Sequence, residues 1–272
     1  MNNQIAFYPI QPEWQNVFSY YRQINLPFPA SQHIAYMYEF KINSLFDVSI
    51  PGIPDACTDL IFCSNGKRES NLVVASPPHR IFRTFESNVI YTGIRLLPQQ
   101  RIFSFQIPLK HLFQHFTVPL FDVIDFPFDL YEQLISTPSL KEKAELFSSY
   151  FQKCNDQHVS KLDIVHACMQ KITCNQGILK LKELEQYTGF SERYLRNLFS
   201  EYVGLSPKHF LQLYRFQITV QKMATHNLLD INQFLMKGLF YDESHFYKEF
   251  KRYAKMTPKE YATLLNKTIL HK

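Results

Sequence analysis

Ser191-Glu-Arg-Tyr-Leu-Arg-Asn-Leu-Phe-Ser-Glu-Tyr-Val-Gly-Leu-Ser-Pro207 has a second copy later in the chain, Asp242-Glu-Ser-His-Phe-Tyr-Lys-Glu-Phe-Lys-Arg-Tyr-Ala-Lys-Met-Thr-Pro258, at a constant offset of 51 residues. Each copy begins with a residue that can cap the start of a helix. Each ends in Ser-Pro or Thr-Pro, where proline can begin the next helix. Apolar residues recur four apart, as at Leu195 and Phe199, so one face of each helix is expected to be buried.

A shorter helical segment precedes each copy, at residues 181–187 and 231–237, and Gly189 permits a tight turn in the first unit. A short helix, a turn and a longer helix together make a helix-turn-helix unit. Its longer helix should expose polar side chains, some of which can reach base edges in a DNA major groove. The first exposed face comprises Glu192, Arg193, Arg196, Asn197 and Ser200, and the second comprises Glu243, Ser244, Tyr247, Lys248 and Lys251.

Residues 207–224, between the two units, are expected to form one continuous helix. At about 1.5 Å per residue this helix would span roughly 27 Å. That length approaches the roughly 34 Å between successive major grooves on one side of B-DNA. An ordinary helical bundle with a chance repeat is the alternative. The joint recurrence of cap, apolar spacing and proline favours two helix-turn-helix units.

Charge is unevenly distributed along the 272 residues. Residues 1–155 carry 12 Lys and Arg against 13 Asp and Glu, a net charge of −1. Residues 156–272 carry 17 against 11, a net charge of +6. A basic segment attracts polyanions, so this distribution is compatible with a nucleic-acid partner for the carboxy-terminal part.

The amino-terminal part has the texture of a β domain, because short β-branched and aromatic runs alternate with proline turns. Strands are expected at 34–42, 58–63, 71–75 and 89–97, and residues 102–107 could continue the sheet. Short helices are expected from Leu109 onward, and a boundary between the two parts near residues 153–158. A helix over 140–151 carries an apolar stripe that is either an intrachain packing surface or a dimer helix.

Several classes of function are disfavoured. The seven glycines are scattered, which excludes a GxGxxG turn and a Walker-type phosphate loop. His111 and His115 have a metal-compatible spacing, but no third ligand is evident, and no Gly-x-Ser-x-Gly elbow is present. We therefore expect no enzyme, no cofactor and no metal. Without a membrane-spanning run or a signal-peptide pattern at the start, we expect a cytoplasmic protein with no membrane partner.

Residues from about 160 to 265 resemble the two-unit DNA-binding domain of the AraC/XylS transcription regulators. The resemblance rests on Gly189-Phe-Ser-Glu-Arg-Tyr-Leu-Arg-Asn-Leu-Phe199, on Gly204-Leu-Ser-Pro207, and on Phe240-Tyr-Asp-Glu-Ser-His-Phe246. Thr257-Pro258 and Arg215 add to it.

The resemblance implies which residues contact DNA. Carried over by position, the base-reading residues are Arg193, Arg196, Asn197, Glu243, Ser244, Tyr247 and Lys248. We expect contacts to the DNA backbone from Ser200, Lys208, Lys251 and Lys259. This chain departs from the family pattern at four positions. Glu185 and Leu235 stand where the family usually has a small alanine. Leu239 stands where it has a glycine, with Gly238 one residue early, and Asn197 stands where a basic residue is common.

Segments 54–62 and 92–98 are similar to a degenerate cupin-like β domain that binds an effector or mediates dimerisation in some of these regulators. The candidate ligand-binding residues in this chain are Tyr36, Tyr38, Arg80, Arg83, Tyr91 and Arg95. Inward-facing arginines could bind a carboxylate or a phosphate. The alternative is that they pair with Asp55, Asp59 or Glu86.

The sequence thus predicts an α+β protein with a β-rich effector or dimerisation domain over 1–135. A helical linker over 136–157 and a double helix-turn-helix domain over 158–272 would follow. The function expected is sequence-specific binding of double-stranded DNA, with activation or repression through recruitment or blocking of RNA polymerase, which the family implies. A small-molecule effector or homodimer formation through the amino-terminal domain would modulate this function. One alternative is a ligand- or partner-binding protein whose helical domain no longer binds DNA. Another is a cupin enzyme fused to a helical module, which tightly bound metal would reveal.

Overall fold

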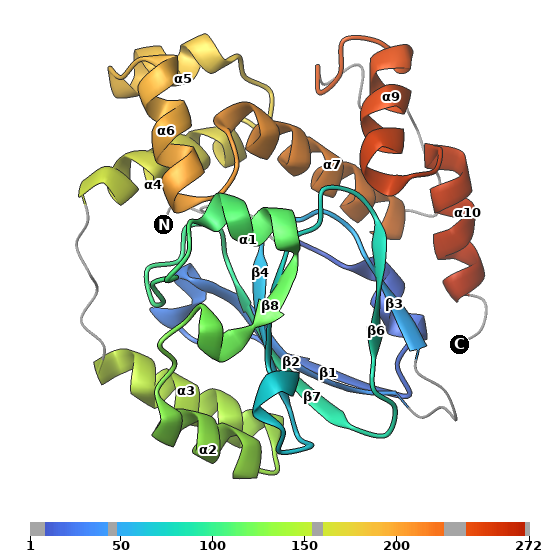
Figure 1. The fold of residues 1–272 in the computed structure, drawn as a ribbon. Coiled ribbons are helices and arrows are strands. Elements are labelled where there is room, and N and C mark those ends of the chain that lie inside the picture. Colours follow the sequence, from blue (N-terminus) through green and yellow to red (C-terminus); the bar gives the residue numbers. More distant parts are fainter. Residues whose placement is uncertain (1–8, 43–47, 154–159, 226–237, 270–272) are drawn as a thin grey trace.

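A computed structural model describes residues 9–42, 48–153, 160–225 and 238–269. Its amino-terminal half is built on β-strands and its carboxy-terminal half on helices, so the predicted α+β architecture is confirmed (Figure 1). The strands are β1 (Tyr20–Ile24), β2 (Ile34–Lys41), β3 (Val48–Gly52), β4 (Thr58–Cys63), β5 (Leu72–Ala75), β6 (Ile81–Phe85), β7 (Ile90–Leu96) and β8 (Thr117–Pro119). The α-helices are α1 (Leu109–His115), α2 (Phe128–Ser136), α3 (Leu140–Lys153), α4 (Ser160–Cys174), α5 (Leu181–Thr188), α6 (Glu192–Tyr202), α7 (Pro207–Thr225), α9 (Glu243–Ala254) and α10 (Pro258–Ile269).

Six strands form an antiparallel sheet in the order β1-β2-β7-β4-β5-β8, and β3 pairs with β6 in a second, two-stranded sheet. The four strands expected from the sequence correspond to β2, β4, β5 and β7. Residues 102–107, which could have continued the sheet, do not do so. Apart from an isolated bridge between Phe105 and Ile124, that segment pairs with no strand of the described part of the chain.

The large sheet is buried on both faces, and side chains of β2 alternate between two cores. Met37 belongs to the core that α2 and α3 cover, while Tyr36, Tyr38 and Phe40 belong to the core on the β3–β6 side. Short 3-10 helices contribute to the cover, among them Pro12–Asn16, which carries Trp14.

Helix α3 packs on the sheet rather than connecting two domains. Its apolar stripe, Leu140, Ala144, Phe147 and Phe151, is buried in the core shared with the sheet. Lys143 forms a buried ion pair with Glu39 of β2 and donates to Thr92 of β7. The stripe is therefore an intrachain packing surface, and it lies within the helical segment expected over 136–157.

A third core holds the helical half together, and it includes Ile53 and Ala56 from the amino-terminal half. The short helix expected at 181–187 is α5, and the connecting helix expected at 207–224 is α7. The short helix expected at 231–237, with Leu235, lies outside the described residues. None of the helices within the described ranges combines the length and apolar composition that crossing a membrane requires.

Candidate nucleic-acid interface and pocket

The first helix-turn-helix unit consists of α5, a turn and α6. Gly189 ends α5 in the left-handed region at φ 75°, a conformation that glycine adopts without strain. Ser191 caps α6, because its side chain accepts a hydrogen bond from the backbone N–H of Tyr194 at 3.3 Å. Glu185 accepts from the backbone N–H of Glu192. The glutamate that replaces the family's alanine is thus a second acceptor at the positive end of the longer helix.

The outward face of α6 has the residues expected of it. Leu195, Leu198 and Phe199 are buried in the helical core. Arg193, Arg196 and Asn197 are exposed, and Ser200 is partly buried. The only described ion pair on this face joins Arg196 to Glu192 at 3.0 Å, one turn apart and well exposed. Such a pair contributes little and leaves the guanidinium free to exchange partners.

In the second unit, the turn before α9 has Leu239 at the position where the family usually has glycine. Gly238, one residue earlier, takes the left-handed conformation at φ 70°, and Leu239 is buried in the helical core. Asp242 caps α9 by accepting from the backbone N–H of His245 at 2.7 Å. The departure at Leu239 therefore leaves a capped helix with a buried apolar face, including Phe246 and Phe250.

On α9, Glu243, Ser244 and Lys248 are exposed and Tyr247 is partly buried. The lysines expected to contact the DNA backbone, Lys208, Lys251 and Lys259, are all exposed. All seven base-contact candidates and all four backbone-contact candidates are thus at least partly accessible to solvent. Their contact with DNA stays a prediction.

Tyr241 was missed in the sequence analysis. It is 93% exposed and lies directly before the helix cap Asp242, whereas Leu239 and Phe240 just before it are buried. Its backbone N–H donates to the His245 ring at 3.4 Å, so the backbone is held while the ring points into solvent. The repeat offers a signal for this residue, because Phe190 occupies the same place in the first unit. Phe190 instead packs on Tyr194, with ring centroids 4.9 Å apart.

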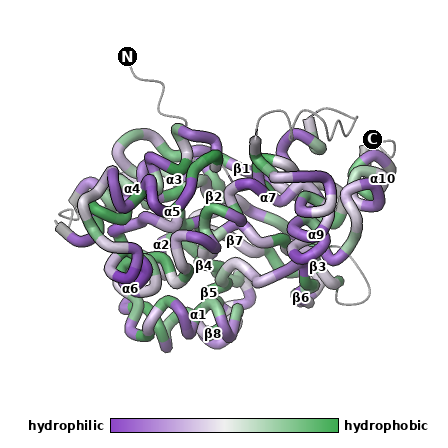
Figure 2. The backbone as a smooth tube through the Cα atoms, turned by 90° about the horizontal axis from the view of Figure 1, so that it is seen from above, coloured by the Kyte–Doolittle hydropathy of each residue, from purple (hydrophilic) through white to green (hydrophobic). Residues whose placement is uncertain are grey.

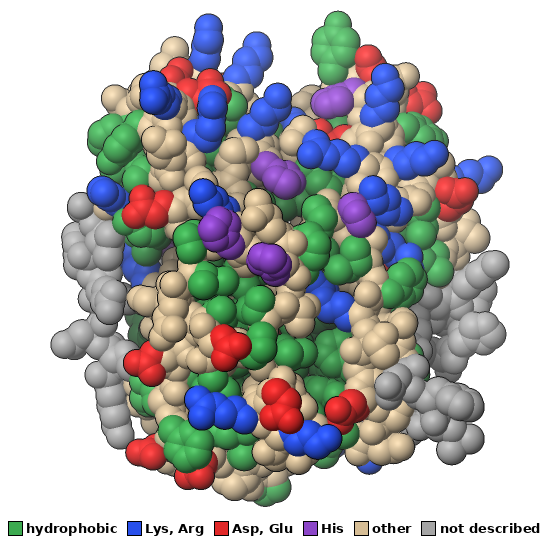
Figure 3. Space-filling view, viewed as in Figure 1, with side chains coloured by type: hydrophobic (Ala, Val, Ile, Leu, Met, Phe, Trp, Pro, Cys, Tyr) green, Lys and Arg blue, Asp and Glu red, His purple; other side chains and the backbone are tan. Residues whose placement is uncertain are grey.

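Helix α7 joins the two units. Its 19 residues correspond to a rod of about 28 Å. In Figure 1, α6 and α9 both lie in the upper part of the molecule, at opposite ends of α7. The view from above in Figure 2 places them on opposite sides, each with hydrophilic residues along it. Figure 3 shows Lys and Arg side chains gathered in this upper part.

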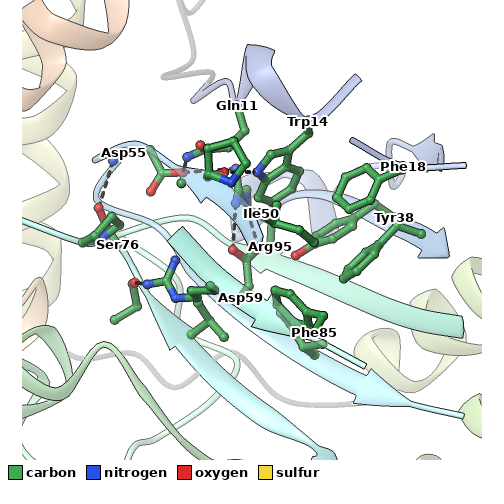
Figure 4. A pocket seen from close by; sticks show the side chains of 18 residues that line it. Gln11, Trp14, Phe18, Tyr38, Ile50, Asp55, Asp59, Ser76, Phe85 and Arg95 are labelled. Atoms are coloured by element: carbon green, nitrogen blue, oxygen red, sulfur yellow. Dashed lines mark hydrogen bonds and ion pairs between the residues drawn. The ribbon is translucent and has the colours of Figure 1, made fainter. Parts of the chain in front are cut away.

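A pocket lies between the two sheets of the amino-terminal half (Figure 4). Its walls are largely aromatic and apolar, with Trp14, Phe18, Phe40, Ile50, Ile61 and Phe85 among them. Tyr38 crosses Gly93 of the neighbouring strand, where a Cβ atom would lie 2.1 Å from the tyrosine ring. The Tyr38 hydroxyl is buried and has no hydrogen-bond partner among the described residues. The free space in the pocket is about 30 Å³, enough for about two water molecules.

Arg95 forms the polar side of the pocket. Its Nε and Nη2 atoms donate to the two carboxylate oxygens of Asp59 at 2.9 and 2.7 Å. Its Nη1 atom lies 3.0 Å from Asp55 and donates to the Tyr36 hydroxyl at 2.9 Å. Burial alone would lower the pKa of Arg95, but Asp59, Tyr36 and Asp55 together outweigh it and raise that pKa well above its ordinary value. Arg95 is therefore a structural cation whose donors are already used.

The six residues of the expected ligand set do not converge. Tyr38, Arg83 and Arg95 line the pocket. Tyr36 reaches it through Arg95, whereas Arg80 pairs with Glu13 at 2.6 Å and Tyr91 stacks on Phe40 behind the wall. The sequence left two alternatives for the arginines, ligand binding or pairing with carboxylates. Arg95 follows the second, because it pairs with Asp55 and Asp59.

The charges around the pocket balance. Arg83 donates to the backbone carbonyl of Ala75 at 2.9 Å, and burial lowers its pKa from the ordinary value of 12.5. With Arg83 and Arg95 positive and Asp55 and Asp59 negative, the four charges sum to zero. The pocket therefore has no surplus positive charge to receive an anion.

The histidines considered as metal ligands, His111 and His115, lie on exposed positions of α1. Within the described ranges, no three metal-ligating side chains gather at one place. His209, at the start of α7, stacks on Tyr253 of α9 with ring centroids 6.1 Å apart. Its burial, with a smaller effect from nearby Arg252, lowers its pKa from the ordinary value of 6.5.

Comparison with known proteins finds a family match in the helical half. Residues 184–263 match the model of a helix-turn-helix domain family. No curated protein sequence matches the chain.

Solved structures of ToxT from Vibrio cholerae are similar over most of both chains. The 1.65 Å structure in the P21 form has 11% identity and a TM-score of 0.42, and the match covers 84% of this chain and 97% of that one. ToxT from strain O395 has 11% identity and a TM-score of 0.44, and the match covers 84% of this chain and 96% of that one. ToxT from strain SCE256, bound to an unsaturated fatty acid, has 13% identity and a TM-score of 0.38, and the match covers 84% of this chain and 91% of that one. TM-scores this low describe a partial likeness, from which nothing follows about ligands or partners.

Proposed function

We propose that the chain is a transcription regulator that binds double-stranded DNA, because residues 184–263 belong to the AraC/XylS-type helix-turn-helix family that their sequence resembles. The observation that carries this proposal is the pair of capped helices, α6 and α9, at opposite ends of α7 on one side of the molecule. Both present polar faces that no other part of the described chain covers. A regulator of this kind acts where bacterial DNA lies, in the cytoplasm.

The two faces would enter successive major grooves. Arg193, Arg196 and Asn197 would read bases in one groove, and Glu243, Ser244, Tyr247 and Lys248 in the next. Ser200, Lys208, Lys251 and Lys259 would hold the register through the phosphates. Binding would recruit or block RNA polymerase, and a second copy of the chain would extend the site if the regulator acts as a homodimer.

The experiment is a fluorescence-anisotropy titration of the full chain against DNA sites selected from a random pool. We expect Arg196→Ala to cost about 1–3 kcal/mol at the selected site and to relax base choice at one position. Lys251→Ala should weaken binding to all sequences alike and make the salt dependence shallower. Unchanged discrimination in the first variant, or a sequence-specific loss in the second, would contradict the assigned roles. Absence of binding by the wild-type chain would favour the alternative of a partner-binding protein.

We propose further that the pocket between the sheets is an effector site for an uncharged, largely apolar molecule. The aromatic walls and the unpartnered Tyr38 hydroxyl support a ligand with an apolar body and one hydrogen-bond acceptor. The balanced charges argue against an anion, although ToxT has been solved with an unsaturated fatty acid. Thermal-shift titrations with a fatty acid and the alcohol of the same chain length would test the class. Stabilisation by the acid alone would contradict it.

A further inference from the structure

Gln217 is a polar residue buried in the middle of α7. It is 2% exposed, between the buried residues Phe216 and Val220. Its Nε2 atom donates to the backbone carbonyl of Pro54 at 2.7 Å, and its Oε1 atom accepts from the backbone N–H of Ile10 at 3.0 Å. A buried amide that lost these partners would carry a desolvation cost. The position of α7 is thereby tied to two backbone groups of the amino-terminal half.

Gln11, the residue after Ile10, fixes the segment to which Gln217 is bonded. Its Nε2 atom donates to the Ile53 carbonyl and to the Asp55 carboxylate, both at 2.8 Å. Its Oε1 atom accepts from the Ile53 backbone N–H at 2.9 Å. Residues 10–11 and 53–55 therefore form one hydrogen-bonded layer, with α7 on one side.

The other side of this layer is the pocket. Gln11 and Asp55 both line it, and Asp55 lies 3.0 Å from Arg95 (Figure 4). The second carboxylate oxygen of Asp55 accepts from the Cys57 backbone N–H at 3.0 Å, and its own N–H donates to Ser76 at 2.8 Å. The polar wall of the pocket is thus continuous with the groups that hold α7.

Because the free volume of the pocket is small, an occupant can move the polar wall that is bonded to the groups holding α7. An occupant larger than about two water molecules that lies fully enclosed between the walls has to displace part of them. We propose that Gln217 is the positioning residue through which the state of the pocket sets the position of α7, and with it the relative placement of α6 and α9. This inference rests on the proposed function and names how that function is regulated. The coupling acts equally in both directions, so DNA that fixes α7 changes the affinity of the pocket for its occupant.

A double-mutant cycle on the full chain tests the inference without an identified ligand. Asp55→Asn keeps the shape of the side chain and removes its charge opposite Arg95. Gln217→Leu removes both bonds from α7. We expect Asp55→Asn to change the dissociation constant for DNA at least about threefold in the wild-type background, and to have no effect in the Gln217→Leu background. Equal effects in both backgrounds would overturn the inference.

Gln221→Leu is the matched control, because it makes the same substitution one turn further along α7 at an exposed position. The effect of Asp55→Asn should persist in that background. If Asp55→Asn does not fold, Gln11→Ala takes its place, since it removes the side chain that links residues 53–55. Loss of the pocket effect in the control background as well would overturn the role of Gln217.

Hydrogen exchange of the α7 amides provides a readout that does not depend on DNA. Asp55→Asn should speed exchange in α7 when Gln217 is present, with or without Gln221→Leu, and should add nothing when Gln217 is replaced. If the wild-type chain binds no DNA, the proposed function fails and the exchange data still decide the coupling. Unaltered exchange across α7 would overturn it.

Discussion

At the scale of single residues, an exposed aromatic side chain next to a recognition helix is informative because of its surroundings. Isolated apolar residues on a surface are ordinary. Tyr241, however, lies between the buried residues Leu239 and Phe240 and the cap Asp242, so its backbone is held on both sides while its ring lies in solvent. It is held at the edge where the second unit would meet a groove.

We expect Tyr241→Ala to weaken DNA binding about tenfold, equivalent to ~1.4 kcal/mol. The lost contact would be apolar stacking against sugar or base, so the slope of affinity against salt concentration should stay the same. Phe128→Ala is a suitable control, because Phe128 is 55% exposed on α2, in the amino-terminal half. An equal loss in both variants, or a shallower salt slope for Tyr241→Ala, would contradict the assignment.

His209 provides a pH dependence of stability at the same scale. Burial holds its pKa in the folded chain below the ordinary value of 6.5. At a pH above about 6.5 the ring is neutral in both states and carries no penalty. As the pH falls, the unfolded chain takes up the proton more readily than the folded one, so the free energy of unfolding decreases.

Urea unfolding of the full chain at pH values between about 7.5 and 5 measures this effect. The stability of the wild type should decline toward acid pH, and the decline should be smaller in His209→Gln, which cannot be protonated. Identical pH profiles for the two proteins would show that His209 does not contribute. His166 adds an effect of the same sign, because burial lowers its pKa as well.

At the scale of elements, the start of α6 depends on a residue that departs from the family pattern. Glu185 accepts from the N–H of Glu192, one of the first donors of the helix, which have no partner within it. We expect Glu185→Ala, which restores the family's usual residue, to lower the free energy of unfolding by ~1 kcal/mol.

Gln186→Ala, one residue further along α5 and exposed, should be nearly neutral in the same chemical-denaturation measurement. A stabilising effect of Glu185→Ala would mean that packing of the alanine contributes more to stability than the hydrogen bond of Glu185 does. The Glu185 carboxylate would then be a tolerated substitution without a role in the start of α6.

At the scale of the whole molecule, the two halves contact each other at several places besides Gln217. The Arg80 backbone N–H donates to the Tyr253 carbonyl at 2.6 Å, and Arg101 pairs with Asp163 at 2.6 Å. Gly204, after α6, lies against Phe113 of α1, where an added Cβ atom would be 2.7 Å from the ring. The halves are therefore expected to unfold together.

Two glycine substitutions isolate the contact between halves. Gly204 and Gly189 both have positive φ values, 77° and 75°, so replacement by alanine strains both backbones similarly, by about 1–2 kcal/mol. A Cβ atom at Gly189 meets nothing within 4 Å, whereas at Gly204 it collides with Phe113. Gly204→Ala should therefore cost about 1–3 kcal/mol more in thermal or urea unfolding. Equal costs would indicate that α1 moves aside freely and that the halves are loosely joined.

The sequence by itself determined the helix-turn-helix units, because each depends on local signals that recur at a fixed spacing. Caps such as Ser191 and Asp242, the turn at Gly189 and the apolar spacing within the repeat act over a few residues, and the family match agrees with them. The same holds for α7 and for the main strands, whose residue types suit a buried sheet.

Only the tertiary structure decided which side chains meet. Arg95 and Asp59 are 36 residues apart and lie on neighbouring strands, so their pairing depends on a register that one residue of slip would reverse. Pro54 and Gln217 are separated by 163 positions, and nothing near either one specifies the other. Whether an arginine faces a pocket or a glutamate, and whether a glutamine joins two halves, depends on packing between distant segments, which short-range patterns do not encode.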